Sequence, residues 1–161
     1  CTIMVADCLP VLLADRAGRV VGAAHCGWRG LAGDAGQGVL ESLWRAMRPQ
    51  LDGDAQAARD MVAWLGPCIG PDAFEVGPEV REAFLARDPD AAACFRAHGD
   101  GKFLADLPAL ARRRLQALGI TAIHGNDGTP AWCTVGSPSR FFSHRRDRVS
   151  GRFAAGVWLV A

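Results

Sequence analysis

Apolar positions in the first 65 residues predict several strands and one helix. Short β-prone or continuous apolar runs predict strands at Thr2–Ala6, Pro10–Asp15, Arg19–His25 and Met61–Leu65. The segment Asp15-Arg-Ala-Gly18 is typical of a tight turn, so the second and third runs are predicted to form a hairpin. Apolar residues at helical spacing predict a helix within Gly33–Met47 that stops at Pro49, followed by a surface loop over residues 49–58.

The rest of the chain mixes helices with strands. Pro78–Ala86 has an acidic first turn, and Asp106 with Pro108 marks the start of a helix that Gly119 ends. Further strands are predicted at Ile120–Ile123, Phe141–Ser143 and Phe153–Val160. A hairpin combined with this mixed order indicates an α+β fold in which helices pack on mixed β-sheets, within a single domain over residues 1–161.

Composition fits a packed domain without an obvious macromolecular partner. The 161 residues are 50% hydrophobic and carry a net charge of +1, so no nucleic-acid or membrane partner is expected. No apolar run reaches the ~18 residues that span a bilayer. Six widely spaced cysteines without a C-x-x-C motif favour reduced thiols and a cytoplasmic protein. Because the first residue is Cys1 rather than Met and the opening residues already have the pattern of a strand, we expect an N-terminally truncated domain.

The densest group of reactive side chains lies near the ends of the predicted hairpin. A turn centred between Arg16 and Ala17 pairs positions whose numbers sum to 33, which places Cys8 opposite His25 with Cβ atoms about 5 Å apart. A turn with a bulge at Gly18 would shift the register by one, place Cys26 opposite Cys8, and turn His25 to the other face. The sequence leaves both registers open.

A thiolate and a neutral imidazole at this spacing could bind zinc. A catalytic zinc site has three protein ligands and one open position, and only Cys8 and His25 are evident here. The same two residues could instead be a buried small side chain and a structural histidine, or form a metal-free nucleophile and base.

Arginines supply candidate anion-binding groups. Arg29 follows the hairpin and precedes a glycine-rich stretch that leads into a helix, an arrangement that suits an anion but matches no established phosphate-loop pattern. Arg145 and Arg146 lie in a second basic segment, which could equally be a solvated edge.

Several motifs together resemble the YfiH-like family, also called laccase-domain or multicopper polyphenol oxidase proteins. The matching segments, in family order, are VADCLPVLLAD, GRVVGAAHCGWRG, LGPCIGPDAFEVGPEV, ADLPALARRRLQALGI, Cys133-Thr134 and FFSHRRD with SGR. They extend over nearly the whole chain, and ADCLP together with AHxGWRG is highly specific.

The resemblance implies a layered α/β sandwich with mixed sheets and a zinc site of one cysteine and two histidines. Cys8 and His25 match two of these ligands, and the third would lie upstream of this sequence. Family members are reported to phosphorolyse adenosine, inosine, guanosine and methylthioadenosine, and to deaminate adenosine. The older family name implies copper-dependent phenol oxidation, and a cysteine-hydrolase activity has also been suggested.

Two positions depart from the family pattern. Phe74 and His144 stand where the family usually has tyrosine, and the chain contains no tyrosine. Any role of those hydroxyl groups in substrate contact is therefore in doubt, although the metal ligands are not affected.

We therefore expect a zinc-dependent purine nucleoside phosphorylase with adenosine deaminase activity. Cys8 and His25 are the expected metal ligands and Arg29 the expected phosphate-binding residue, assisted by Arg145 and Arg146, with Asp7 orienting a ligand. The expected partners are a purine nucleoside and phosphate, and self-association is possible. A copper oxidase and a metal-free Cys–His hydrolase are the alternatives, although four histidines are too few for a multicopper site.

Overall fold

A four-stranded mixed sheet forms the centre of the computed structural model, which describes residues 1–35, 37–51 and 56–160. In spatial order its strands are β3 (Val21–Cys26), β2 (Leu9–Asp15), β4 (Met61–Leu65) and β8 (Ala122–Gly125). β2 is antiparallel to both of its neighbours, and β4 is parallel to β8. The strand over Met61–Leu65 coincides with the predicted one.

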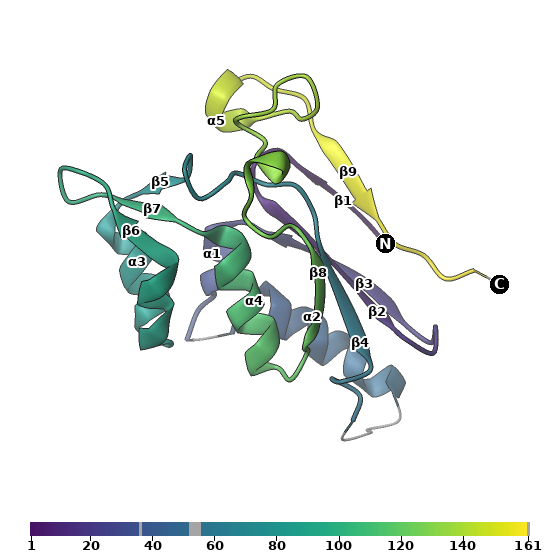
Figure 1. The fold of residues 1–161 in the computed structure, drawn as a ribbon. Helices are drawn as coiled ribbons and strands as arrows, with labels where there is room; N and C mark the ends of the chain where they lie inside the picture. Colours follow the sequence, from purple (N-terminus) through teal and green to yellow (C-terminus); the bar gives the residue numbers. More distant parts are fainter. Residues whose placement is uncertain (36, 52–55, 161) are drawn as a thin grey trace.

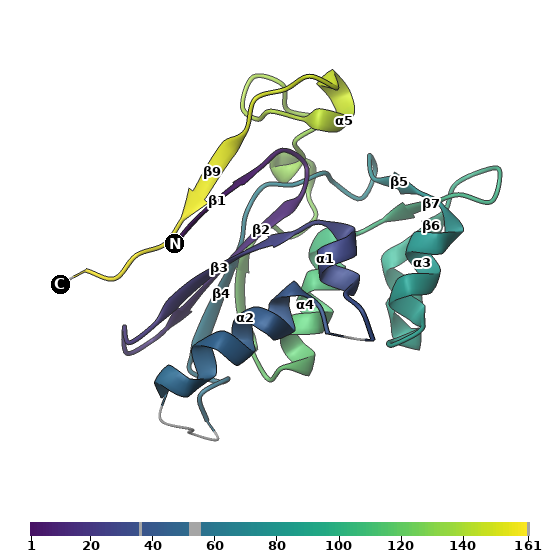
Figure 2. The same cartoon turned by 180° about the vertical axis from the view of Figure 1, so that it is seen from behind.

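Helices cover one face of this sheet (Figures 1 and 2). They are α1 (Trp28–Ala32), α2 (Val39–Met47) and α4 (Leu107–Ala117). Alternate strand positions point towards them and are fully buried, including Leu9, Val11, Leu13 and Leu65. These side chains pack with Leu40, Leu110 and Leu115 of the helices into one hydrophobic core.

Two smaller antiparallel sheets complete the layers. One is a ribbon of β1 (Thr2–Val5) and β9 (Phe153–Gly156); the other has the order β5 (Glu75–Val76), β7 (Phe103–Ala105), β6 (Phe95–Ala97). The remaining helices are α3 (Pro78–Leu85), α5 (His144–Asp147) and the short 3₁₀ helices η1 (Arg48–Leu51), η2 (Pro89–Cys94) and η3 (Pro130–Trp132). Mixed and antiparallel sheets layered with helices confirm the predicted fold class.

An apolar hollow lies between the β1–β9 ribbon and the sheet face that carries no helices. Its volume is about 500 Å³, and its lining includes Leu12, Trp64, Phe141 and Phe153. Among the described residues, no helix is long and apolar enough to cross a membrane.

The turn between β2 and β3 is longer than either predicted form. The Asp15 amide donates to the carbonyl oxygen of Val20, so four residues, 16–19, form the loop. Gly18 has the left-handed φ of +71° that such a turn requires. The Asp15 carboxylate accepts both the backbone and the guanidinium N–H groups of Arg19, which lowers the pKa of Asp15.

Several predicted boundaries and one predicted strand are wrong. The helix predicted within Gly33–Met47 begins only at Val39, and residues 28–32 form a separate short helix. Residues 141–143 form no strand, because Ser143 caps α5 by accepting the Arg146 N–H at 3.1 Å. Of the predicted loop 49–58, residues 52–55 lie outside the described residues, while residues 49–51 belong to η1.

Candidate functional site

The hairpin register places Cys8 beside Gly27. Pro10 pairs with His25, so paired positions sum to 35 and both predicted registers are wrong. The physical reason is the four-residue turn, which moves the pairing by two positions relative to the direct Cys8–His25 pairing. A shift of two positions does not change which face of the sheet a side chain points to. His25 therefore lies on the same face as Pro10, and so does Cys8, two positions before Pro10.

Cys8 is half-buried at the edge of a pocket. An ideal Cβ built on Gly27 would lie 3.0 Å from the Cys8 Sγ atom, which supports continuation of the register to this pair. Burial raises the pKa of the Cys8 thiol, the Asp7 carboxylate raises it further, and Arg152 opposes this. A free thiolate is therefore disfavoured at neutral pH, whereas a cation bound at the sulfur would favour it.

His25 is exposed. It lies diagonally across the strand pair from Cys8, not directly opposite it. Diagonal neighbours on one face are about 7–8 Å apart at Cα, which is still within reach of a shared ion. A soft thiolate and an imidazole are suitable zinc ligands. The described residues contain no group of three or more His, Cys, Asp or Glu side chains that could hold a metal, so the pair fits two ligands of an incomplete set.

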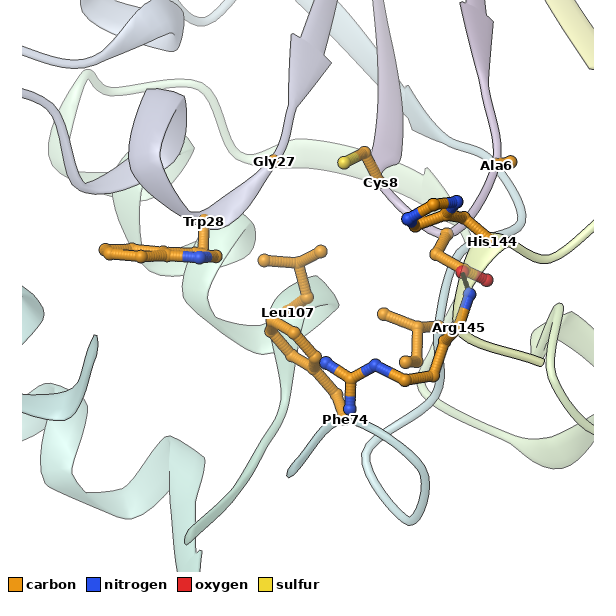
Figure 3. A pocket seen from close by; sticks show the side chains of 10 residues that line it. Ala6, Cys8, Gly27, Trp28, Phe74, Leu107, His144 and Arg145 are labelled. Carbon is orange, nitrogen blue, oxygen red and sulfur yellow. Dashed lines mark hydrogen bonds between the residues drawn. The ribbon is translucent and has the colours of Figure 1, made fainter. Parts of the chain in front are cut away.

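The pocket beside Cys8 has a volume of about 160 Å³ and is mainly apolar and aromatic. Trp28 at the start of α1 and Phe74 just before β5 contribute aromatic rings (Figure 3). His144 and Arg145 from α5 lie across the pocket from Trp28, with the Arg145 guanidinium 5.8 Å from the centre of the Phe74 ring. The pocket thus combines flat apolar surfaces, a thiol and a cationic side chain.

The three arginines considered from the sequence have different environments. Arg29 is exposed, and its guanidinium stacks 4.4 Å from the centre of the Trp28 ring. Arg145 donates to the carbonyl oxygen of Glu75 at 3.2 and 3.3 Å and forms no carboxylate ion pair among the described residues. Arg146 pairs with Asp147 and also donates to loop carbonyl groups. Arg146 therefore stabilises its own loop, and its assistance in binding phosphate stays a prediction.

Asp7 bonds to residues from the C-terminal part of the chain. Its carboxylate accepts hydrogen bonds from Thr134 Oγ1 at 2.6 Å, Ser143 Oγ at 3.1 Å and the Arg145 backbone N–H at 2.6 Å. These contacts differ from the expected one, in which Asp7 orients a metal ligand. No local pattern in the sequence could have indicated Thr134 and Ser143, because they lie 127 and 136 positions from Asp7.

Gly27→Ala is expected to impair metal binding while leaving the fold stable. Gly27 has φ −71° and ψ 159°, which alanine adopts without strain, but the added methyl group would press on the Cys8 sulfur. We expect zinc affinity to fall by roughly 10-fold, the scale of disturbed ligand orientation. Gly30→Ala is the matched control, since its nearest contact would be an ordinary 3.6 Å. Competition with a chromogenic chelator measures both variants, and equal affinities would contradict the close approach.

Comparison with known proteins places residues 1–160 in the family model described as multi-copper polyphenol oxidoreductase laccase. The chain is 49% identical over 160 residues to a protein of Escherichia coli named purine nucleoside phosphorylase YfiH. It is 48% identical to a purine nucleoside phosphorylase of Pseudomonas aeruginosa. These alignments cover 99% of this chain but only 59% and 60% of the relatives, so the chain spans about three fifths of their length.

Solved structures show the same fold. The Neisseria meningitidis protein NMB0706 matches the whole chain with a TM-score of 0.88 at 49% identity, and 60% of that protein is covered. YlmD from Geobacillus stearothermophilus matches 95% of the chain with a TM-score of 0.80 at 29% identity, and 54% of it is covered. The chain belongs to the YfiH-like, multi-copper polyphenol oxidoreductase laccase family.

Proposed function

We propose that the protein is a zinc-dependent purine nucleoside phosphorylase that also deaminates adenosine. The observation that carries this proposal is the pocket that brings the Cys8 thiol, two aromatic rings and the Arg145 guanidinium together. Relatives of nearly half-identical sequence bear the name purine nucleoside phosphorylase. Adenosine, inosine, guanosine and methylthioadenosine are the proposed substrates.

The pocket walls suit the two parts of the reaction. Purine bases are flat and aromatic, so Trp28 and Phe74 provide surfaces for stacking or edge contact. Phosphorolysis replaces the bond between ribose C1′ and purine N9 with a bond from C1′ to a phosphate oxygen. Arg145 in the pocket and Arg29, which stacks on the pocket residue Trp28, are the proposed phosphate-binding residues, because guanidinium groups bind phosphate through paired hydrogen bonds.

Cys8 and His25 would hold the zinc ion together with a third ligand outside the described residues. When bound, zinc supplies Lewis-acid chemistry at such an open site. Cys8 lines the pocket, so the ion would face the nucleoside, and His25 would approach from the neighbouring strand.

Metal analysis separates this proposal from its two alternatives. Zinc at one ion per chain, with phosphate-dependent release of hypoxanthine from inosine, supports the phosphorylase. Copper with phenol oxidation would support the oxidase that the family name implies. The raised pKa of the Cys8 thiol counts against the metal-free Cys–His hydrolase, which needs a thiolate.

Arg29→Lys is expected to lower phosphorolysis more than deamination. Phosphorolysis requires a held phosphate and deamination does not, and lysine offers a point charge where arginine offers a planar fork. The stack of Arg29 on Trp28 is also lost. We expect a fall of roughly 10-fold in kcat/KM for phosphate and less than about 2-fold for adenosine deamination. Initial rates with inosine and with adenosine measure the two reactions.

The matched control for this variant is Arg81→Lys. Arg81 likewise stacks on an aromatic ring, 5.1 Å from the centre of Phe103, but it does not line the pocket. Equal losses of phosphorolysis and deamination in Arg29→Lys would show that Arg29 is structural.

A further inference from the structure

Asp7 links the residues just before β2, where Cys8 lies, to the segment that carries Arg145. Its side chain is buried, with 9% of the residue exposed, and each of its carboxylate oxygens accepts at least one hydrogen bond. Two of the three donors, Ser143 Oγ and the Arg145 N–H, belong to the residues that begin α5. The third, Thr134 Oγ1, anchors the preceding loop.

The backbone of Asp7 is also fixed. Its φ of +83° lies in the left-handed region, which aspartate tolerates better than most residues. The Asp7 carbonyl oxygen accepts the N–H of Ile69, another pocket residue, at 2.9 Å. Cys8 follows directly, so the conformation of one residue sets the direction of the thiol and holds the start of α5.

We propose that Asp7 is a positioning residue that holds Arg145 in the pocket for an anion bound beside Cys8. The identification of that anion as phosphate rests on the proposed function. α5 is only four residues long and packs at the surface, so its first N–H groups need partners from elsewhere. The Asp7 carboxylate supplies one partner to Arg145, and Ser143 Oγ supplies another to Arg146.

The Arg145 side chain depends on this anchor because its other contacts are weak. Among the described residues, its guanidinium donates hydrogen bonds only to the Glu75 carbonyl oxygen, at 3.2 and 3.3 Å, and otherwise lies 5.8 Å from the centre of the Phe74 ring; the residue is exposed. Without the Asp7 bond, the backbone of α5 would lose its connection to the segment that carries Cys8 at this point, and the guanidinium would no longer be held at a fixed distance from the thiol.

Asp7→Asn tests this role with little disturbance to the backbone. Asparagine has the same size and also tolerates positive φ, but its amide NH2 group replaces one acceptor oxygen. Among the described residues the carboxylate accepts three hydrogen bonds. The Thr134 and Ser143 hydroxyls can turn to accept from the new NH2 group, whereas the Arg145 N–H can only donate and loses its charged acceptor. Asp15→Asn is the matched control: Asp15 is also a buried aspartate at a strand end, but it bonds Arg19 in the distant turn.

Three measurements on the purified protein distinguish positioning from general stabilisation. For Asp7→Asn we expect unchanged zinc content, a KM for phosphate raised roughly 10-fold, and a KM for inosine within about 2-fold of wild type. Hydrogen exchange at the Arg145 amide should become roughly 10-fold faster, because this N–H exchanges a charged acceptor for a weaker, neutral one. Asp15→Asn should change neither KM.

Other results would overturn the proposal. These are an unchanged KM for phosphate in a folded Asp7→Asn variant, loss of zinc from it, or unchanged exchange at Arg145. If Asp7→Asn does not fold, Ser143→Ala and Thr134→Val each remove one donor and leave the carboxylate in place. A rise of roughly 3-fold or more in the KM for phosphate in either variant supports the proposal, and no rise in both overturns it.

Failure of the proposed function can be recognised separately. If the wild-type protein does not phosphorolyse inosine, calorimetric titration with inorganic phosphate replaces the kinetic measurement. Weaker phosphate binding by Asp7→Asn than by wild type then supports the positioning role without the phosphorylase. Equal binding, or no phosphate binding by wild type, overturns the positioning role.

Discussion

Replacing Cys8 by alanine is expected to remove zinc from the protein and to abolish measurable nucleoside turnover, and His25→Ala is expected to do the same. An open catalytic zinc site has three protein ligands, so the loss of one leaves an ion held by two. We expect zinc affinity and turnover to fall together by more than roughly 100-fold, beyond the 10- to 100-fold effect of disturbing only the residues around a ligand. Metal content and inosine phosphorolysis measure the two effects.

Stability should change little in these variants. Cys8 is half-buried and His25 is exposed, and neither belongs to the hydrophobic core. Cys133→Ala is a suitable control, because Cys133 is another half-buried cysteine and does not line the Cys8 pocket. Retention of full phosphorolysis by either ligand variant would refute a metal mechanism at this site.

Glu41→Ala is expected to cause a large loss of stability without acting on the pocket. Glu41 and Arg114 form an ion pair of 2.9 Å with both side chains 7% exposed. The same carboxylate accepts the N–H of Gly38 at 2.9 Å, at the start of α2. Removing it breaks a buried ion pair by deleting one partner, which typically costs about 3–5 kcal/mol. Chemical denaturation gives the free energy of unfolding.

The control for this prediction is Glu79→Ala, at the equivalent first turn of α3 but exposed. That variant should lose less than about 1 kcal/mol, as exposed charges usually do. A loss below about 1 kcal/mol in Glu41→Ala would mean that the buried pair contributes no more than a surface pair.

Local signals predicted the elements whose structure depends on local interactions. The helix that begins after Asp106 is predictable because aspartate is a common N-cap. In the structure this side chain accepts the Ala109 N–H, as the prediction requires. The sheet β5–β7–β6 was not predicted, since strands of two or three residues are too short to show alternation. The β2–β3 register was missed because Asp15 and Arg19 stabilise a longer turn than the glycine alone indicates.

The candidate site was likewise predictable only where it depends on a local pattern in the sequence. The motif and spacing predict Cys8 and His25 as ligands; the structure keeps both on one face of the sheet, although the predicted register is wrong. The environment of Arg146, by contrast, depends on Asp147 and on carbonyl groups of residues 134 and 141 that only the folded loop brings together. The bonds of Asp7 join residues more than 120 positions apart, and no sequence period reports such contacts.

β1 and β9 are far apart in the sequence, so during synthesis β1 is made long before its partner strand. The Cys1 amino group and the Val157 carbonyl oxygen, 2.8 Å apart, are separated by 156 positions. Closing so long a loop costs roughly 3 kcal/mol more in chain entropy than closing a short hairpin. The β2–β3 hairpin can therefore form early in synthesis, whereas the ribbon and the Asp7 contacts must await synthesis of residues 134–156, which contain their partners. A nascent chain would thus acquire its core before its pocket.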